Sequence, residues 1–216
     1  MIDRRHLLIA GAATVTVLGG TRFAMAQATM SRITAYGFSF PALKGGDIRL
    51  ADSAGKPIMI VNTASQCGYT PQYAGLQNLW SEFHGQGLMI IGVPSNDFGG
   101  QEPGGTTDIA ETAEHQYGVM FPIAAKAVVR GPSAHPFYKW AAAERPKELP
   151  GWNFHKYLIG RDGYIAEVFP SAVEPGDTRV KTAIGRALAD ESASPAVLRA
   201  ASCRGRRRRS RRFGLR

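Results

Sequence analysis

The hydrophobic positions of this chain follow two kinds of pattern between residues 36 and 190. Short continuous aliphatic runs at 58–61 and 88–93 are typical of strands that are buried on both faces. Longer segments repeat apolar residues at helical spacing, which predicts helices over 71–84, 107–116, 134–143 and 177–189. Weaker apolar segments bounded by turn residues predict strands at 36–41, 47–50, 121–129, 157–160 and 164–169.

The order of these elements predicts the fold class. Residues 36–50 and 157–169 are each expected to form a hairpin, and the sequence contains no internal repeat. Alternating strands and helices indicate an α/β layer structure. Strand, helix, strand, helix, hairpin and helix is the order of a thioredoxin-like fold, in which helices flank a central mixed β-sheet.

Cys67 lies where the apolar run at 58–61 has ended and a helical pattern begins. Thr70 is suited to be the N-cap of that helix and Pro71 its first residue, so the sulfur is expected near a helix N-terminus. The positive end of the helix dipole and the free N–H groups there favour a thiolate over a thiol. The alternative from position alone is a buried, inert cysteine.

The first residues have the pattern of an export signal. Arg4 and Arg5 precede an apolar run over 7–20 that is too short to span a bilayer, and Ala24-Met25-Ala26 matches a cleavage site. We interpret residues 1–26 as a twin-arginine-like signal peptide, which predicts a periplasmic protein without stable membrane insertion after cleavage. The alternatives are a general secretory signal or an uncleaved anchor.

Charge divides the chain into three parts. The formal net charge is +9, of which residues 191–216 carry +8 and residues 1–26 carry +2, which leaves −1 for 27–190. A near-neutral segment of this size is expected to be one domain, with no charge that favours nucleic-acid binding. Residues 191–216 are Arg-rich and poor in apolar residues, so we expect a disordered tail, and its Cys203 forms no evident disulfide with Cys67. Binding of an anionic surface is the alternative function for this tail.

Four segments carry a more specific resemblance. They are N-T-A-S-Q-C-G-Y-T-P-Q-Y at 62–73, P-S-N-D-F-G-G-Q-E-P-G at 94–104, Y-G-V-M-F-P-I at 117–123 and W-N-F-H-K-Y-L at 152–158. In this order and spacing, residues 33–190 resemble a glutathione peroxidase of the cysteine type found in exported bacterial members. The thioredoxin-like domain is therefore expected to occupy 27–190.

The resemblance implies an active site made of four residues. In the family these are a cysteine or selenocysteine, a glutamine, a tryptophan and an asparagine, which correspond here to Cys67, Gln101, Trp152 and Asn153. The last three offer N–H donors whose charge does not change over the working pH range. Such donors suit a reaction in which a thiolate attacks a peroxide oxygen and the departing oxygen is stabilised.

The implied function is a thiol-dependent peroxidase that responds to oxidative stress. Hydrogen peroxide and organic or lipid hydroperoxides would be reduced to water or alcohols, with Cys67 passing through a sulfenic acid. Thiols then return Cys67 to its reduced form. No cofactor or metal ion is implied, and the thiol reductant is a co-substrate.

The identity of the reductant depends on a departure from part of the family. Many non-animal members carry a resolving cysteine on the helix after the Q-E-P-G loop and use thioredoxin, but residues 107–115 contain no cysteine, and Ser95 stands where many relatives have one. Glutathione is therefore the expected reductant, with a thioredoxin-like protein as the alternative. Cys203 is the remaining candidate for a resolving thiol.

Two further expectations concern assembly and the histidines. The segment between Trp140 and Trp152 is short, whereas tetrameric animal members carry a long insertion there, so the resemblance implies a monomer with an open site. The five histidines lack metal-ligand spacing, and His155 is expected at the surface.

Three other classes of protein have weaker support. A peroxiredoxin would require Thr in place of Ala64, and a disulfide-exchange protein or copper chaperone would require a second cysteine just after Cys67. A peroxide-sensing protein, whose oxidised Cys67 is recognised by a partner and not turned over, remains open from the sequence.

Overall fold

The computed structural model describes residues 33–190. The predicted signal peptide at 1–26, the predicted Arg-rich tail at 191–216 and Cys203 lie outside the described residues. Four α-helices are present in the described part: α1 (Gln72–Phe83), α2 (Thr106–Ala110), α3 (Pro136–Glu144) and α4 (Thr178–Ala189). A π-helical segment, Glu111–Gln116, directly continues α2, and short 3-10 helices occupy Ala35–Gly37, Leu50–Ser53 and His84–Gln86.

Among residues 33–190, six of the seven strands that the sequence predicts are present, and they form a hairpin and a mixed sheet. β1 (Ser39–Pro41) pairs antiparallel with β2 (Asp47–Arg49). The four-stranded sheet has the order β4-β3-β5-β6, from β3 (Ile58–Thr63), β4 (Met89–Pro94), β5 (Lys156–Ile159) and β6 (Ile165–Phe169). β3 runs parallel to β4 and antiparallel to β5, which is antiparallel to β6. All six residues of β3 are buried, which explains its continuous apolar run.

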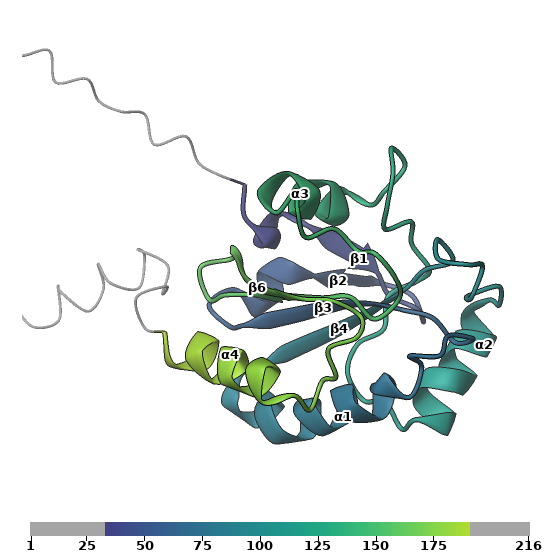
Figure 1. Ribbon diagram of the computed structural model, residues 1–216, viewed down its shortest axis with the longest axis horizontal. Helices are drawn as coiled ribbons and strands as arrows, with labels where there is room; N and C mark the ends of the chain where they lie inside the picture. Colours follow the sequence, from purple (N-terminus) through teal and green to yellow (C-terminus); the bar gives the residue numbers. More distant parts are fainter. Residues whose placement is uncertain (1–32, 191–216) are drawn as a thin grey trace, which may run out of the picture. The chain divides into compact units, whose positions relative to one another are not determined.

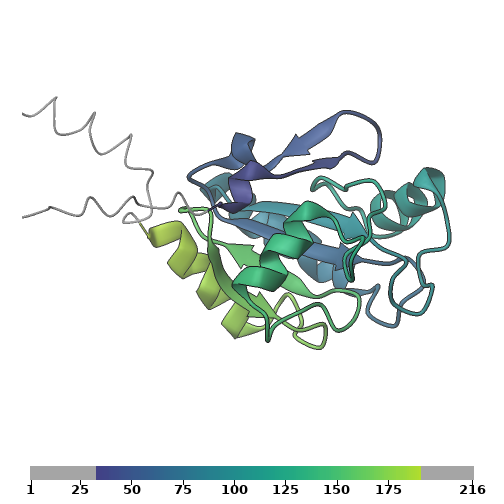
Figure 2. The same ribbon diagram turned by 90° about the horizontal axis from the view of Figure 1, so that it is seen from above.

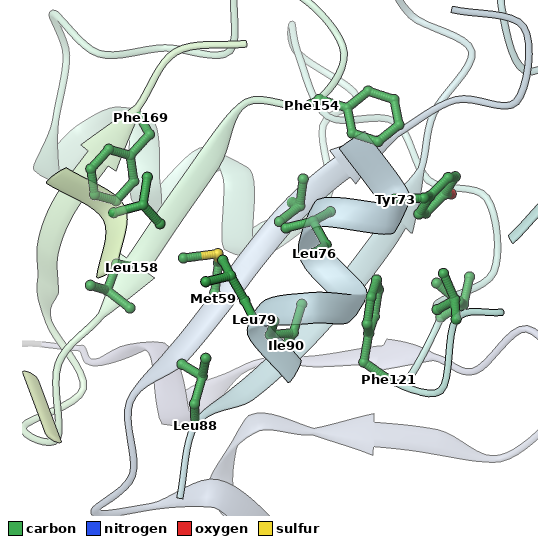
Figure 3. Close-up of a cluster of buried hydrophobic side chains, with 14 of the residues drawn as sticks. Met59, Tyr73, Leu76, Leu79, Leu88, Ile90, Phe121, Phe154, Leu158 and Phe169 are labelled. Carbon is green, nitrogen blue, oxygen red and sulfur yellow. The ribbon is translucent and has the colours of Figure 1, made fainter. Parts of the chain in front are cut away.

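The sheet separates two hydrophobic cores (Figures 1 and 2). On one face, α1 and α4 cover the sheet, and Figure 3 shows Leu76 and Leu79 of α1 beside Met59 and Ile90 of the strands. On the other face, α3 and the β1-β2 hairpin enclose a second core around Phe40 and Phe137. Helices on both faces of a mostly buried sheet confirm the predicted α/β layers.

The segment 121–129 is not the strand that its apolar residues predict. It makes single bridges, one of them between Ile123 and Gly92 of β4, and the N–H of Ala124 donates to the Gly92 carbonyl oxygen at 2.8 Å. Pro122 has no N–H, so a continuous ladder cannot form there. A Cβ on Gly92 would lie 2.6 Å from the Ile123 side chain, so this close contact depends on the glycine.

The helix after Cys67 begins one residue later than predicted, at Gln72, and Thr70 is not its capping residue. The residue before the helix is Pro71, which provides no side-chain cap. Thr70 instead uses its hydroxyl group in the turn that carries Cys67. Among the helices that the structure describes, none is long and apolar enough to cross a membrane.

Candidate active site

Cys67 lies in the turn between β3 and α1, and hydrogen bonds within this turn fix its position. The backbone N–H of Cys67 donates to Thr70 Oγ1 at 3.0 Å, and the Thr70 hydroxyl donates to the carbonyl oxygen of Ala64 at 2.8 Å. The N–H of Tyr69 donates to Cys67 Sγ at 3.4 Å. This bond places one backbone N–H donor at the sulfur from within the turn that carries it.

The loop that carries Gln101 is bonded to the turn of Cys67. The N–H of Gln66 donates to the Gln101 carbonyl oxygen at 3.0 Å. The Glu102 carboxylate accepts from the N–H of Ser65 at 2.9 Å and from the Ser65 hydroxyl at 3.1 Å. These three bonds join two loops that are far apart in sequence, so Gln101 is held beside the turn of the cysteine.

Glu102 is fully buried, which is unusual for a carboxyl group. Burial raises its pKa above the ordinary value, although the two hydrogen bonds from Ser65 act in the opposite direction. Its Oε1 has no hydrogen-bond partner among residues 33–190. Lys126 donates to the Glu102 carbonyl oxygen at 3.0 Å and so fixes the loop from outside.

Asn153 connects to Gln101 directly. Its Nδ2 donates to Gln101 Oε1 at 3.0 Å, and the asparagine side chain is fully buried. This bond uses the oxygen of the Gln101 amide, so the Gln101 amide nitrogen is left to donate elsewhere. Trp152 is 40% exposed, and its ring lies 5.9 Å from the ring of Phe98 between centroids. A hydrogen-bonded pair of amides and a partly exposed indole therefore lie on loops that are bonded to Asn62 of β3 and to Gln66, the residue before Cys67.

The turn that presents Trp152 and Asn153 is fastened to the end of β3. Asn62 Nδ2 donates to the Trp152 carbonyl oxygen at 3.0 Å, and the N–H of Phe154 donates to the Asn62 carbonyl oxygen at 2.6 Å. Phe154 has a φ of 64°, a left-handed conformation that is costly for an aromatic residue. Its ring is fully buried and packs edge-on against Tyr73 at 5.3 Å. Burial of the ring stabilises a turn that the backbone alone would disfavour.

Comparison with known proteins identifies the family. The sequence profile of the glutathione peroxidase family matches residues 35–142. The hydroperoxy fatty acid reductase gpx1 of Synechocystis sp. is 44% identical over 153 residues, which cover 67% of this chain and 90% of the relative. The glutathione peroxidase-like peroxiredoxin GPX5 of Chlamydomonas reinhardtii is 41% identical, over 65% of this chain and 88% of the relative. The chain belongs to the glutathione peroxidase family.

Solved structures agree with this assignment. The crystal structure described as "Trgpx in apo form" is 32% identical, covers 73% of this chain and 97% of its own, and has a TM-score of 0.60. A thioredoxin-family thiol:disulfide interchange protein from Chlorobium tepidum is 14% identical, over 70% of this chain and 92% of its own, with a TM-score of 0.54. That second likeness concerns the fold alone and confirms the predicted thioredoxin-like architecture. The chain is accordingly a peroxidase of the glutathione peroxidase family.

A groove of about 700 Å³ opens beside Trp152 in this peroxidase. Most of its surface is apolar, and its lining includes the polar side chains of Lys147, Glu148 and His155. Tyr69, whose N–H donates to Cys67 Sγ, is another of its lining residues. The groove therefore extends from the turn of the cysteine along the exposed tryptophan.

His155 is buried, so its expected place at the surface is wrong. Only 4% of it is exposed, and burial together with the neighbouring Lys156 lowers its pKa to about 4. His155 directly precedes the inner strand β5, and its ring lies 4.8 Å from the ring of Tyr157 between centroids. Among residues 33–190 no group of three His, Cys, Asp or Glu side chains could hold a metal ion.

Several residues that organise the site were not predicted from the sequence. Thr70, Glu102 and Asn62 act through hydrogen bonds to other loops, and nothing in their spacing indicates those partners. Glu102 directly follows Gln101 in the Q-E-P-G segment, so its position indicated that it lies near the site. The sequence did not show that its carboxylate points toward Ser65. Lys156 had the clearest signal, because it is a charged residue within the apolar pattern of a strand.

Proposed function

We propose that this peroxidase reduces hydrogen peroxide and organic hydroperoxides by attack of the Cys67 thiolate. The sulfur forms a bond with one peroxide oxygen while the O–O bond breaks. The departing oxygen leaves with the electron pair and takes a proton to become water or an alcohol, and Cys67 becomes a sulfenic acid. The observation that carries this proposal is the hydrogen-bonded connection from the turn of Cys67 to Gln101 and from Gln101 to Asn153.

The three partner residues have distinct roles in this proposal. The free N–H donors of Gln101 and the indole N–H of Trp152 are offered to the negative charge that moves from sulfur to the departing oxygen. Asn153 orients Gln101 through the 3.0 Å bond to its Oε1. Because none of these groups titrates in the physiological range, their contribution does not depend on pH.

The groove beside Trp152 supports organic hydroperoxides as substrates. An apolar channel of this size suits the hydrocarbon part of a hydroperoxide, since burial of each methylene group contributes about 0.8 kcal/mol. The Synechocystis relative bears the name hydroperoxy fatty acid reductase, which agrees with this choice. We include fatty acid and other lipid hydroperoxides together with hydrogen peroxide.

Glutathione is the reductant that we propose. Residues 33–190 contain no cysteine besides Cys67, so a small thiol that attacks the sulfenic acid directly is the simplest route. The second candidate is a thioredoxin-like protein, which the peroxiredoxin name of the Chlamydomonas relative favours. A protein that senses peroxide in a single turnover is the third, because the domain itself offers no resolving thiol.

Steady-state consumption of peroxide distinguishes these candidates. We expect the protein with glutathione to consume many equivalents of hydrogen peroxide and of a fatty acid hydroperoxide, and Cys67→Ser to consume none. Cys203→Ser serves as the matched control and should retain activity with glutathione. Turnover with thioredoxin but not with glutathione would overturn the reductant, and a single equivalent with either would favour the sensor.

We also propose that the protein acts as a monomer in the periplasm, under oxidative stress. Support comes from the twin-arginine-like pattern at 1–26 and from the short segment between Trp140 and Trp152. Fractionation of cells that express the full chain, with mass spectrometry of the mature N-terminus, tests export and cleavage near Gln27. Gel filtration of the mature protein tests the oligomeric state.

A further inference from the structure

Lys156 is a fully buried lysine in the first position of β5. Lysine is almost never fully buried unless its ammonium group is paired. Its register partners in the sheet are Val61 of β3 and Phe169 of β6, so it interrupts an otherwise apolar layer. The chemistry proposed above assigns no role to this residue, although it belongs to the same segment as Trp152 and Asn153.

The ammonium group has three acceptors at short distance. Lys156 Nζ donates to Gln72 Oε1 at 2.7 Å, to the Phe154 carbonyl oxygen at 2.7 Å and to the Val173 carbonyl oxygen at 2.8 Å. A protonated lysine has three N–H donors, whereas a neutral amine has two. Only the protonated form therefore satisfies all three acceptors at once.

These acceptors belong to three separate parts of the site. Gln72 is the first residue of α1, which follows the turn of Cys67. Phe154 holds the strained left-handed position directly after Asn153. Val173 follows the groove residues Ser171 and Ala172, and Gln72 Nε2 strengthens this link by donating to the Ser171 carbonyl oxygen at 2.8 Å.

We propose that protonated Lys156 is a positioning residue that holds the Trp152–Asn153 turn and the groove wall in register with the helix that follows Cys67. The inference rests on the proposed function, because it concerns the reaction of Cys67 with peroxide. Lys156 itself does not contact the reacting atoms. It acts through Phe154, whose carbonyl oxygen loses a charged donor when the lysine loses its proton.

The surroundings of Lys156 determine the pH at which its ammonium group loses a proton. Burial lowers its pKa to about 7, and the carboxylate of Glu174 acts in the opposite direction. His155 is the other titratable neighbour, and with its pKa lowered to about 4 it stays neutral above pH 6. The elements packed against the ammonium group present uncharged residues: Gln72 from α1, Val61 from β3 and Phe169 from β6.

The expected consequence is a pH-dependent advantage of the parent protein over a variant without the lysine. Below about pH 7 the parent holds the turn with all three bonds, whereas Lys156→Met does not. At pH 9 the parent has lost the proton, and with it the positive charge and one of the three bonds, so its advantage over the variant is smaller. We therefore expect the parent to react with peroxide roughly 10- to 100-fold faster than Lys156→Met at pH 6, a size typical of a small misplacement of reacting groups, and by a clearly smaller factor at pH 9.

The experiment is a stopped-flow measurement of Cys67 oxidation by hydrogen peroxide between pH 6 and pH 9. The proteins are the parent, Lys156→Met, Glu174→Gln and the control Lys139→Met, which removes an exposed lysine from α3. At each pH, the rate constant of Cys67 oxidation in each variant is divided by that of the parent. The titration of the Cys67 sulfur is common to all four proteins, so it does not affect these ratios. Glu174→Gln keeps an acceptor for Gln72 Nε2 but removes the charge that favours protonated Lys156.

Three results support the inference and three overturn it. Support requires a Lys156→Met deficit that becomes smaller toward pH 9, a Glu174→Gln deficit that is largest near pH 7, and a control that matches the parent. A Lys156→Met deficit that is constant with pH, or no deficit, overturns it. If Lys156→Met does not fold, the inference is overturned by a rate constant of Glu174→Gln that is the same fraction of the parent's at every pH. A parent whose Cys67 does not react with peroxide at any pH would instead contradict the proposed function.

Discussion

At the scale of single residues, hydrogen bonds decide which atoms of the site are free to donate. The structure connects the turn of Cys67 to Gln101 and Gln101 to Asn153, which the motifs predict as site residues together with Trp152. What the motifs could not show is how each side chain points. That Asn153 donates to the oxygen of Gln101, and so directs the nitrogen of Gln101 outward, depends on a contact between residues 52 positions apart.

Asn153→Ala tests that contact. The substitution removes the donor to Gln101 Oε1, so we expect the second-order rate constant of Cys67 with hydrogen peroxide to fall about 100-fold, the size seen when one oriented donor is lost. Stopped-flow kinetics measure this constant. Asn78→Ala, an exposed asparagine of α1, is the control and should react like the parent. A rate for Asn153→Ala within a factor of two or so of the control would contradict the orienting role.

At the scale of elements, continuous apolar runs and helical spacing predicted the strands β3 and β4 and the helices α1 and α4 well. These elements are determined by which face they bury, and that information is local. The strand predicted at 121–129 does not form, because Pro122 has no N–H to donate to a strand ladder. The apolar pattern of this segment does not indicate that loss of pairing. Thr70 failed as a cap because tertiary contacts offered its hydroxyl two better partners, Cys67 N–H and the Ala64 carbonyl oxygen.

Thr70→Val tests the turn between β3 and α1. Valine has the same shape but no hydroxyl, so it leaves a buried N–H and a buried carbonyl oxygen without their partner. We expect the free energy of unfolding to fall by about 1–3 kcal/mol, measured by urea denaturation, and Cys67 to react more slowly. Thr70→Ser should restore most of both properties. Thr182→Val, on the exposed side of α4, is the matched control and should stay close to the parent.

At the scale of the whole molecule, the sheet encloses two titratable neighbours, His155 and Lys156, that the sequence did not predict to be buried. Their burial follows from the order β4-β3-β5-β6, which makes β5 an inner strand. A single sequence indicates that a hairpin is present but not which of its strands lies inside. Both groups have lowered pKa values, so the folded protein resists their protonation and its stability depends on pH.

His155 allows a direct test of this dependence. Its pKa is about 4 when folded and 6.5 ordinarily, so between these values the unfolded chain binds a proton that the folded protein does not. Stability must therefore fall as the pH drops from 6.5 toward 4. We expect urea denaturation to show that His155→Phe loses less stability than the parent between pH 7 and pH 4.5, by on the order of 2 kcal/mol. His115→Phe changes an exposed histidine and should follow the parent, and equal losses in all three proteins would contradict the prediction.

Cys67 is the sulfur that we propose attacks the peroxide. The most direct measurement treats the reduced protein with one equivalent of hydrogen peroxide, traps sulfenic acid with a selective reagent and locates the adduct by mass spectrometry. We predict that the adduct forms on Cys67 within the time in which the peroxide disappears, and that Cys67→Ser neither forms it nor consumes the peroxide. Peroxide consumption by Cys67→Ser at the parent rate, or a first adduct on Cys203, would contradict the account.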